Sequence, residues 1–148
     1  MNKIEVHQAI CQHLQKRIDG LTEILKETYE ATANDSKSSA GDKHETAISM
    51  AQLEQEKLTK QINDYLSLQV SLFKINPEKA SSKIELGSLV ETNNGWYYFS
   101  VGLGVFQVRE ITVFAINPLA PIGKLLTGKT ENESINFNGN STTIFSIS

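Results

Sequence analysis

The chain has 148 residues, of which 39% are hydrophobic and 21% are charged, and its formal net charge is −3. This length accommodates one domain or two small ones, and the acidic balance argues against a protein that grips nucleic acid by general charge attraction. The single cysteine, Cys11, excludes an internal disulfide and suits a reducing compartment. No apolar segment approaches the ~20 residues of a membrane span, and no signal peptide is recognisable at the start. We therefore expect a cytoplasmic protein without a membrane partner.

The first half of the sequence has the periodicity of two long helices. Residues alternately three and four positions apart form a coiled-coil seam, made of Ile4, His7, Cys11, Leu14, Ile18, Leu21, Leu25 and Thr28. After a turn-forming segment over 33–41, a second series continues with Ala47, Ala51, Leu58, Ile62, Tyr65 and Leu72. Two helices joined by one short turn run antiparallel. Residues 1–74 are therefore expected to form an antiparallel coiled-coil hairpin, on the order of 45 Å long at ~1.5 Å per residue.

A further apolar row lies near the end of the second predicted helix, outside the seam. It consists of Leu66, Val70 and Phe73. A two-helix hairpin buries only one stripe of each helix against its partner. This row therefore predicts that the base of the hairpin docks on the second half of the chain.

The second half begins after a polar, proline-containing linker over 75–83. From residue 84 onward, valine, isoleucine and aromatic residues alternate with polar ones. This pattern predicts strands over 85–92, 96–101, 104–108, 111–116, 134–137 and 142–147, with a short helix within 122–129. The expected fold class is α+β, with residues 84–148 forming a small, mostly-β domain.

The segment between the two predicted helices carries paired carboxylates in the string Gly-Asp-Lys-His-Glu-Thr-Ala over 41–47. Asp42 and Glu45 are three residues apart, which places both on one face of the first turn of a helix. One interpretation is a capping-box-like arrangement, in which both side chains accept hydrogen bonds from free backbone N–H groups. Another is a metal-binding pair. Both can hold, as a cap in the free protein and a metal ligand in a complex.

The order of these elements resembles the Gre-type transcript-cleavage factors of bacterial RNA polymerase. Members of that family carry Gly-Asp-x-x-Glu-Asn-Ala-Glu-Tyr at the hairpin tip, where this chain has Gly-Asp-Lys-His-Glu-Thr-Ala-Ile-Ser over 41–49. Their Ser-Pro-Leu-Gly-Arg-Ala-Leu-Leu-Gly-Lys-like run aligns without a gap on residues 120–129, and residues 86–90 are similar to their first C-terminal strand. The family's Asn and Tyr are replaced here by Thr46 and Ser49.

The resemblance implies a function and a set of site residues. The second half would be an FKBP-like domain that docks on the polymerase, with Pro121, Gly123 and Lys124 at the docking surface. The hairpin would enter the secondary channel, where Asp42 and Glu45 help hold a Mg²⁺ ion shared with the polymerase active site. The residues expected to touch RNA phosphates are Lys37, Lys43 and His44. The chain would then be a monomeric cofactor, not an enzyme, that stimulates the polymerase's own cleavage of the backtracked RNA 3′ end.

Other functions are compatible with the same residues. A relative with this fold can bind the polymerase channel and regulate or inhibit it without cleavage. A coiled-coil adaptor would not contact polymerase at all. Prolyl isomerase activity is a weaker alternative, because an FKBP-like fold does not by itself imply that activity. His7 and His13 have no metal-binding spacing, and Cys11 at a seam position is expected to be a small buried apolar residue.

Overall fold

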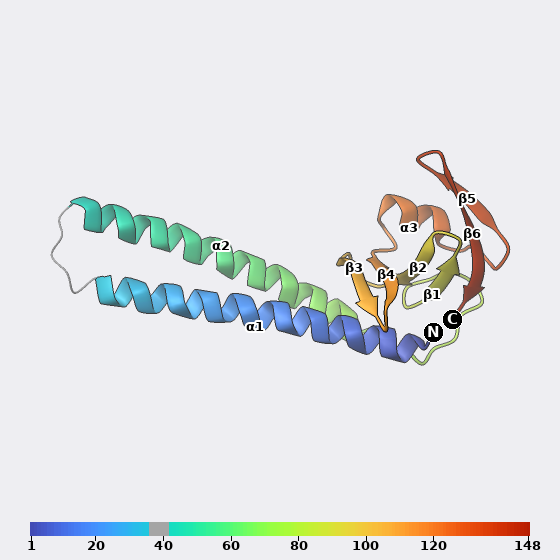
Figure 1. Ribbon diagram of the computed structural model, residues 1–148, viewed down its shortest axis with the longest axis horizontal. Helices are drawn as coiled ribbons and strands as arrows, with labels where there is room; N and C mark the ends of the chain where they lie inside the picture. Colours follow the sequence, from blue (N-terminus) through green and yellow to red (C-terminus); the bar gives the residue numbers. More distant parts are fainter. Residues whose placement is uncertain (36–41) are drawn as a thin grey trace. The chain divides into compact units, whose positions relative to one another are not determined.

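The computed structural model describes residues 1–35 and 42–148, with side chains for 1–34 and 45–148 (Figure 1). The fold is α+β: two long helices are followed by a six-stranded mixed sheet. By their contacts the described residues group into two compact units. Unit 1 combines Met1–Gln12 with Val70–Ser148, and unit 2 is His13–Gln69. This grouping differs from the division expected from sequence, at residues 74 and 84, because the first turns of the first helix belong with the sheet.

The two long helices are α1 (Lys3–Asp35) and α2 (Asp42–Phe73). Both are rich in Leu, Glu, Lys and Gln, neither contains proline, and Gly20 is the single glycine within them. These are residues that favour a helical backbone. No helix in the described part of the chain is long and apolar enough to cross a membrane.

Within unit 2 the helices run antiparallel, as three cross-helix hydrogen bonds demonstrate. Gln69 Nε2 donates to Gln15 Oε1 over 2.7 Å, Arg17 Nη1 to Tyr65 Oη over 3.1 Å, and Gln55 Nε2 to Thr32 Oγ1 over 3.2 Å. Residue numbers thus rise along α1 as they fall along α2, which confirms the predicted direction.

The seam of unit 2 is apolar at one end and polar at the other. Leu14, Ile18 and Leu58 are buried, as the heptad spacing predicts. Over residues 19–34 and 45–57, by contrast, the buried residue is Gln55, while Leu25 is half-buried. Ala47 is exposed, so its predicted place in the seam is wrong.

The strands of unit 1 are β1 (Leu89–Thr92), β2 (Gly95–Phe99), β3 (Gly104–Val108), β4 (Ile111–Ile116), β5 (Ser134–Phe137) and β6 (Asn140–Ile147), and the short helix is α3 (Pro121–Leu126). Their order across the sheet is β3-β4-β2-β1-β6-β5. The β2–β4 pair is parallel, whereas the other neighbours are antiparallel. The predicted strand over 85–92 begins only at Leu89, because Leu86 and Gly87 form a turn with Gly87 at φ +91°.

One face of the sheet carries the main core of unit 1. Its buried members are Ile84, Val90, Tyr97, Phe99, Leu126, Ile135 and Ile144. Side chains alternate between the faces of a strand. Tyr97 and Phe99 therefore point to the same side as Leu126 of α3, and the intervening Tyr98 points to the other.

The first turns of α1 cover that other face. Val6 and Ile10 are almost completely buried, and His7 Nδ1 lies 2.7 Å from Tyr98 Oη. At the turn between β3 and β4, Arg109 forms an ion pair with Glu5 of the same helix. His7, which the heptad pattern assigns to the coiled-coil seam, thus contacts the sheet.

Within unit 1, the two members of the apolar row that were predicted to dock on the sheet are largely exposed. Val70 is 54% and Phe73 is 70% exposed. Ile4, predicted to lie in the seam, is also exposed, at 37%. The helix that contacts the sheet is instead α1, since His7 Nδ1 lies 2.7 Å from Tyr98 Oη and the neighbouring Val6 and Ile10 are almost completely buried.

Candidate functional site

The predicted acid pair lies at the start of α2. Asp42 is the first residue of the helix, and Glu45 follows three residues later with an exposed side chain. Two helical residues at this spacing share one face. Lys37 lies outside the described residues, as do the side chains of Asp42, Lys43 and His44. The pairing of the two carboxylates and the predicted RNA contacts therefore stay predictions.

The capping interpretation depends on where the helix begins. A capping box places the N-cap residue immediately before the first helical residue and its partner three positions after the cap. With α2 beginning at Asp42, the cap position falls on Gly41, which is outside the described residues. The cap and the metal-ligand interpretations therefore both stay predictions.

The donor set expected at the start of α2 consists of two carboxylates, those of Asp42 and Glu45. Among the residues that the structure describes, no group of three or more His, Cys, Asp or Glu side chains could hold a metal. Carboxylate oxygens are the ligands that Mg²⁺ prefers, but two carboxylate groups fill only part of its octahedral coordination shell. A Mg²⁺ ion bound by Asp42 and Glu45 would therefore need further ligands from a partner or from water, and this metal site stays a prediction.

The residues predicted to dock on a partner, Pro121, Gly123 and Lys124, lie in α3. Pro121 opens this helix, where its missing N–H costs nothing. Pro121 and Lys124 are exposed, and the exposed Leu119 and Leu125, which sequence reasoning did not single out, lie at neighbouring positions. The sequence feature that could have pointed to these leucines is the pair of prolines at 118 and 121, which marks a turn beside them.

Gly123 is buried and does not offer a docking surface. A Cβ atom at this position would lie 2.4 Å from the Asn117 carbonyl oxygen and 2.9 Å from the Pro118 carbonyl. The glycine thus allows α3 to pack directly on the backbone that precedes it. Its predicted role in docking is replaced by a structural one.

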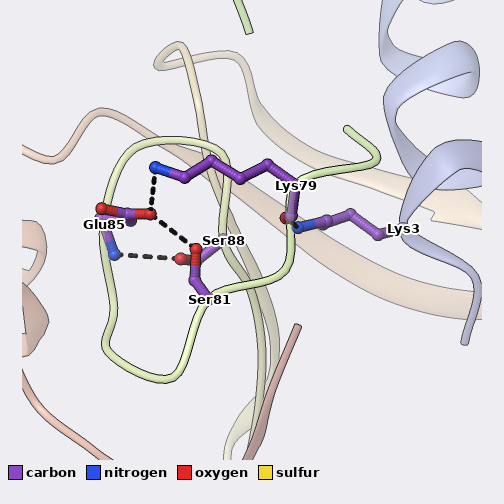
Figure 2. A network of polar contacts seen from close by, with 5 residues as sticks. All are labelled: Lys3, Lys79, Ser81, Glu85 and Ser88. Atoms are coloured by element: carbon purple, nitrogen blue, oxygen red, sulfur yellow. Dashed lines mark hydrogen bonds and ion pairs between the residues drawn. The ribbon is translucent and has the colours of Figure 1, made fainter. Parts of the chain in front are cut away.

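A polar network ties the expected linker to α1 within unit 1 (Figure 2). Lys3 Nζ donates to the Lys79 carbonyl, and Lys79 Nζ is 2.8 Å from Glu85 Oε1, which also accepts a hydrogen bond of 2.7 Å from Ser81 Oγ. The Glu85 N–H donates to Ser88 Oγ over 3.0 Å. The hydrogen bonds from Lys79 and Ser81 lower the pKa of Glu85, and burial lowers that of Lys3. This cluster anchors the 75–83 segment and has no evident chemistry of its own.

The remaining titratable cluster is His7, Cys11 and Tyr98. Burial lowers the pKa of His7 and raises the pKa of both Cys11 and Tyr98. A thiol whose pKa is raised is a poor nucleophile, since the thiolate is the reactive form. The cluster is consistent with packing, although Cys11, which the sequence predicted to be buried, is only half-buried.

No protein-family model, curated protein or solved structure matches the chain. Any functional interpretation therefore depends on the residues at the start of α2, on those around α3, and on the order of the elements.

Proposed function

We propose that this chain is a Gre-type transcription elongation factor that stimulates bacterial RNA polymerase to cleave backtracked RNA. The observation that carries the proposal is the exposed Glu45, three residues after Asp42 at the very start of α2. Helices of 33 and 32 residues support it, because a helix of that length measures about 50 Å and the acids stand at the first turn of the second one.

The finer architecture belongs to the same proposal. Residues 1–74 would act as a coiled-coil hairpin that enters the secondary channel of the polymerase, and residues 84–148 as an FKBP-like docking domain. The mixed sheet with α3 against one face supports the second part. The exposed Pro121 and Lys124, with Leu119 and Leu125 nearby in sequence, would contact the polymerase surface.

In the proposed mechanism the chain contributes positioned charge, while the polymerase contributes the reaction. A second Mg²⁺ in the polymerase site would activate water and stabilise the leaving oxygen when bound. The carboxylates of Asp42 and Glu45 would supply ligands to that ion where the polymerase leaves its coordination shell open. Lys37, Lys43 and His44 would contact phosphates near the RNA 3′ end and orient it. The chain is then a cofactor of another enzyme's nuclease activity.

The test is transcript cleavage in stalled elongation complexes prepared with polymerase from the source organism and Mg²⁺. The native chain is expected to release short 3′ RNA fragments, and the Asp42→Asn/Glu45→Gln variant to lose this activity while still binding polymerase. The matched control is Glu54→Gln/Asp64→Asn, which neutralises two exposed acids elsewhere on α2 and should leave cleavage unchanged. Loss of binding by the tip variant, or equal cleavage by all three proteins, would contradict the proposal.

The second candidate is a channel-binding regulator that does not stimulate cleavage. Thr46 and Ser49 favour it, because they replace the Asn and Tyr of the family motif on the first turns of α2, where both are exposed. In the same assay it predicts tight polymerase binding that does not depend on Asp42 and Glu45, and no shortening of the transcript.

A further inference from the structure

In the half of the helix pair near the start of α2, apolar side chains such as Leu21, Leu25 and Ile48 are only half-buried. Among residues 19–34 and 45–57, the side chain that is buried is that of Gln55, at 7% exposure. A hollow of about 480 Å³ lies beside it, lined by Tyr29 of α1 and by polar residues of α2 that include Thr59 and Asn63. Apolar packing therefore does little to fix how the two helices align in this half.

Gln55 makes a specific connection across that interface. Its Nε2 donates to Thr32 Oγ1 over 3.2 Å, and the Thr32 hydroxyl donates in turn to the Thr28 carbonyl over 2.9 Å. The two bonds link a buried amide of α2 to the backbone of α1. A buried donor deprived of its partner is costly, so this connection favours one alignment of the helices.

We propose that Gln55 and Thr32 form a register lock, a pair of positioning residues that sets where the first turn of α2 lies along α1. A single polar residue at a core position of paired helices commonly specifies register at some cost in stability. The link to the acids at the start of α2 rests on the proposed function, but the lock itself does not.

The heptad spacing by itself does not fix the alignment of the helices, which the Gln55–Thr32 bond favours together with the Gln69–Gln15 and Arg17–Tyr65 bonds. A shift of α2 by seven residues keeps the apolar seam positions opposite one another. In one direction it brings Gln55 to Leu25, and in the other it carries Gln55 past Asp35, the last residue of α1. Either shift leaves the amide without the Thr32 hydroxyl. It also moves the start of α2 by ~10 Å, which is far more than a metal-binding or catalytic arrangement tolerates.

The test measures register directly, by the distance between nitroxide labels on the two helices. Lys16→Cys and Lys57→Cys place the labels at exposed positions offset along unit 2, so that a heptad shift changes their separation by ~10 Å. The background variant Cys11→Ala removes the native thiol. One narrow distance population is expected for the otherwise native chain.

The Gln55→Leu/Thr32→Val variant is expected to broaden that distribution or add a second population displaced by ~10 Å. Its thermal midpoint should not fall, since leucine continues the apolar seam. If the pair only stabilised the fold, the double variant would keep the single native distance and its thermal midpoint would fall. The control Gln52→Leu, at an exposed position one turn away, and the conservative Thr32→Ser should both keep the native distance.

An unchanged single distance in the double variant, with native helical content, would overturn the proposal. If the double variant loses helical content, the single variant Thr32→Val decides by the same criterion; it keeps Gln55 but removes the hydroxyl that accepts from Gln55 and donates to the Thr28 carbonyl. In the stalled-complex assay the double variant should bind polymerase but cleave more slowly. A register change in a chain whose native form shows no cleavage would refute the proposed function and leave the register lock standing.

Discussion

His7 of α1 and Tyr98 of β2 are 91 positions apart in the sequence, yet their side chains meet inside unit 1. His7 Nδ1 lies 2.7 Å from Tyr98 Oη, and the rings meet edge to face with centroids 6.0 Å apart. Tyr98 is fully buried and His7 is 9% exposed. This pair joins the start of the chain to the sheet that forms much later in the sequence, so the first turns of α1 belong to the fold of unit 1.

Removal of the Tyr98 hydroxyl should destabilise unit 1. Tyr98→Phe keeps the ring but leaves the buried His7 Nδ1 without its partner, which costs about 1–3 kcal/mol. The measurement is the free energy of unfolding in urea. Tyr97→Phe is the matched control, because the Tyr97 ring stacks on Phe114 at 5.2 Å and phenylalanine preserves that contact. Equal losses in the two variants would refute the importance of the His7–Tyr98 bond.

Stability should also decrease on the acid side because of His7. Burial lowers the pKa of His7 in the folded chain, so the unfolded state binds a proton at higher pH than the folded state does. The stability that neutral His7 contributes is fully present above the unfolded pKa of about 6.5. It is lost as the pH falls toward the lower pKa of the folded chain, so that the free energy of unfolding decreases by at most about 1.4 kcal/mol per pH unit.

The measurement for this pH effect is the urea midpoint between pH 7.5 and 5, compared for the native chain and His7→Gln. The difference between the two proteins isolates His7 from Glu85 and Glu133, whose pKa values are lowered by hydrogen bonds and which act at lower pH. Parallel pH profiles for the two proteins would contradict the prediction.

The two helices should respond very differently to truncation of apolar side chains near the sheet. Ile10→Ala removes a side chain that is 1% exposed and should cost about 2–5 kcal/mol. Phe73→Ala acts on a side chain that is 70% exposed and should stay within about 0.5 kcal/mol. Chemical denaturation of both variants tests this order. The reverse order would restore the docking role that the sequence assigns to the end of α2.

Local patterns predicted much of the secondary structure. The strand over 111–116 was expected at the residues where β4 lies, since alternating branched and aromatic residues signal a half-buried strand. The heptad spacing also placed Leu14, Ile18 and Leu58 correctly in the buried seam. Each of these depends on neighbours within a few residues, so the sequence carries the information directly.

The surface that covers an apolar helix face could not be predicted in the same way. Periodicity shows that one face of a helix is buried but not what covers it. Val6 and Ile10 are buried close to seam positions, and nothing local indicates that His7 between them contacts Tyr98 of β2. For the same reason Phe73 looked like a docking residue, although its helix face has no cover among the described residues.

The candidate site was predictable in position but not in its supporting structure. Gly41-Asp42 marked the start of α2, and the helix begins there. Gln55 was missed because a polar residue in a polar helix attracts no notice. Its heptad position was the available signal, since it falls seven residues before Ile62 in the predicted seam, just as Thr32 falls seven after Leu25.

Gly123→Ala should destabilise unit 1 although it adds a single methyl group. The new Cβ would lie 2.4 Å from the Asn117 carbonyl oxygen, so α3 must move away from the backbone before it, at a cost of about 1–3 kcal/mol. Gly102→Ala is the matched control, because a Cβ there meets nothing within 4 Å and should change the unfolding free energy by less than about 0.5 kcal/mol. Because α3 carries the exposed Pro121 and Lys124, Gly123→Ala should also weaken polymerase binding through displacement of the helix. Native stability together with weakened binding would instead mean that Gly123 itself lies in the docking surface, contrary to its burial.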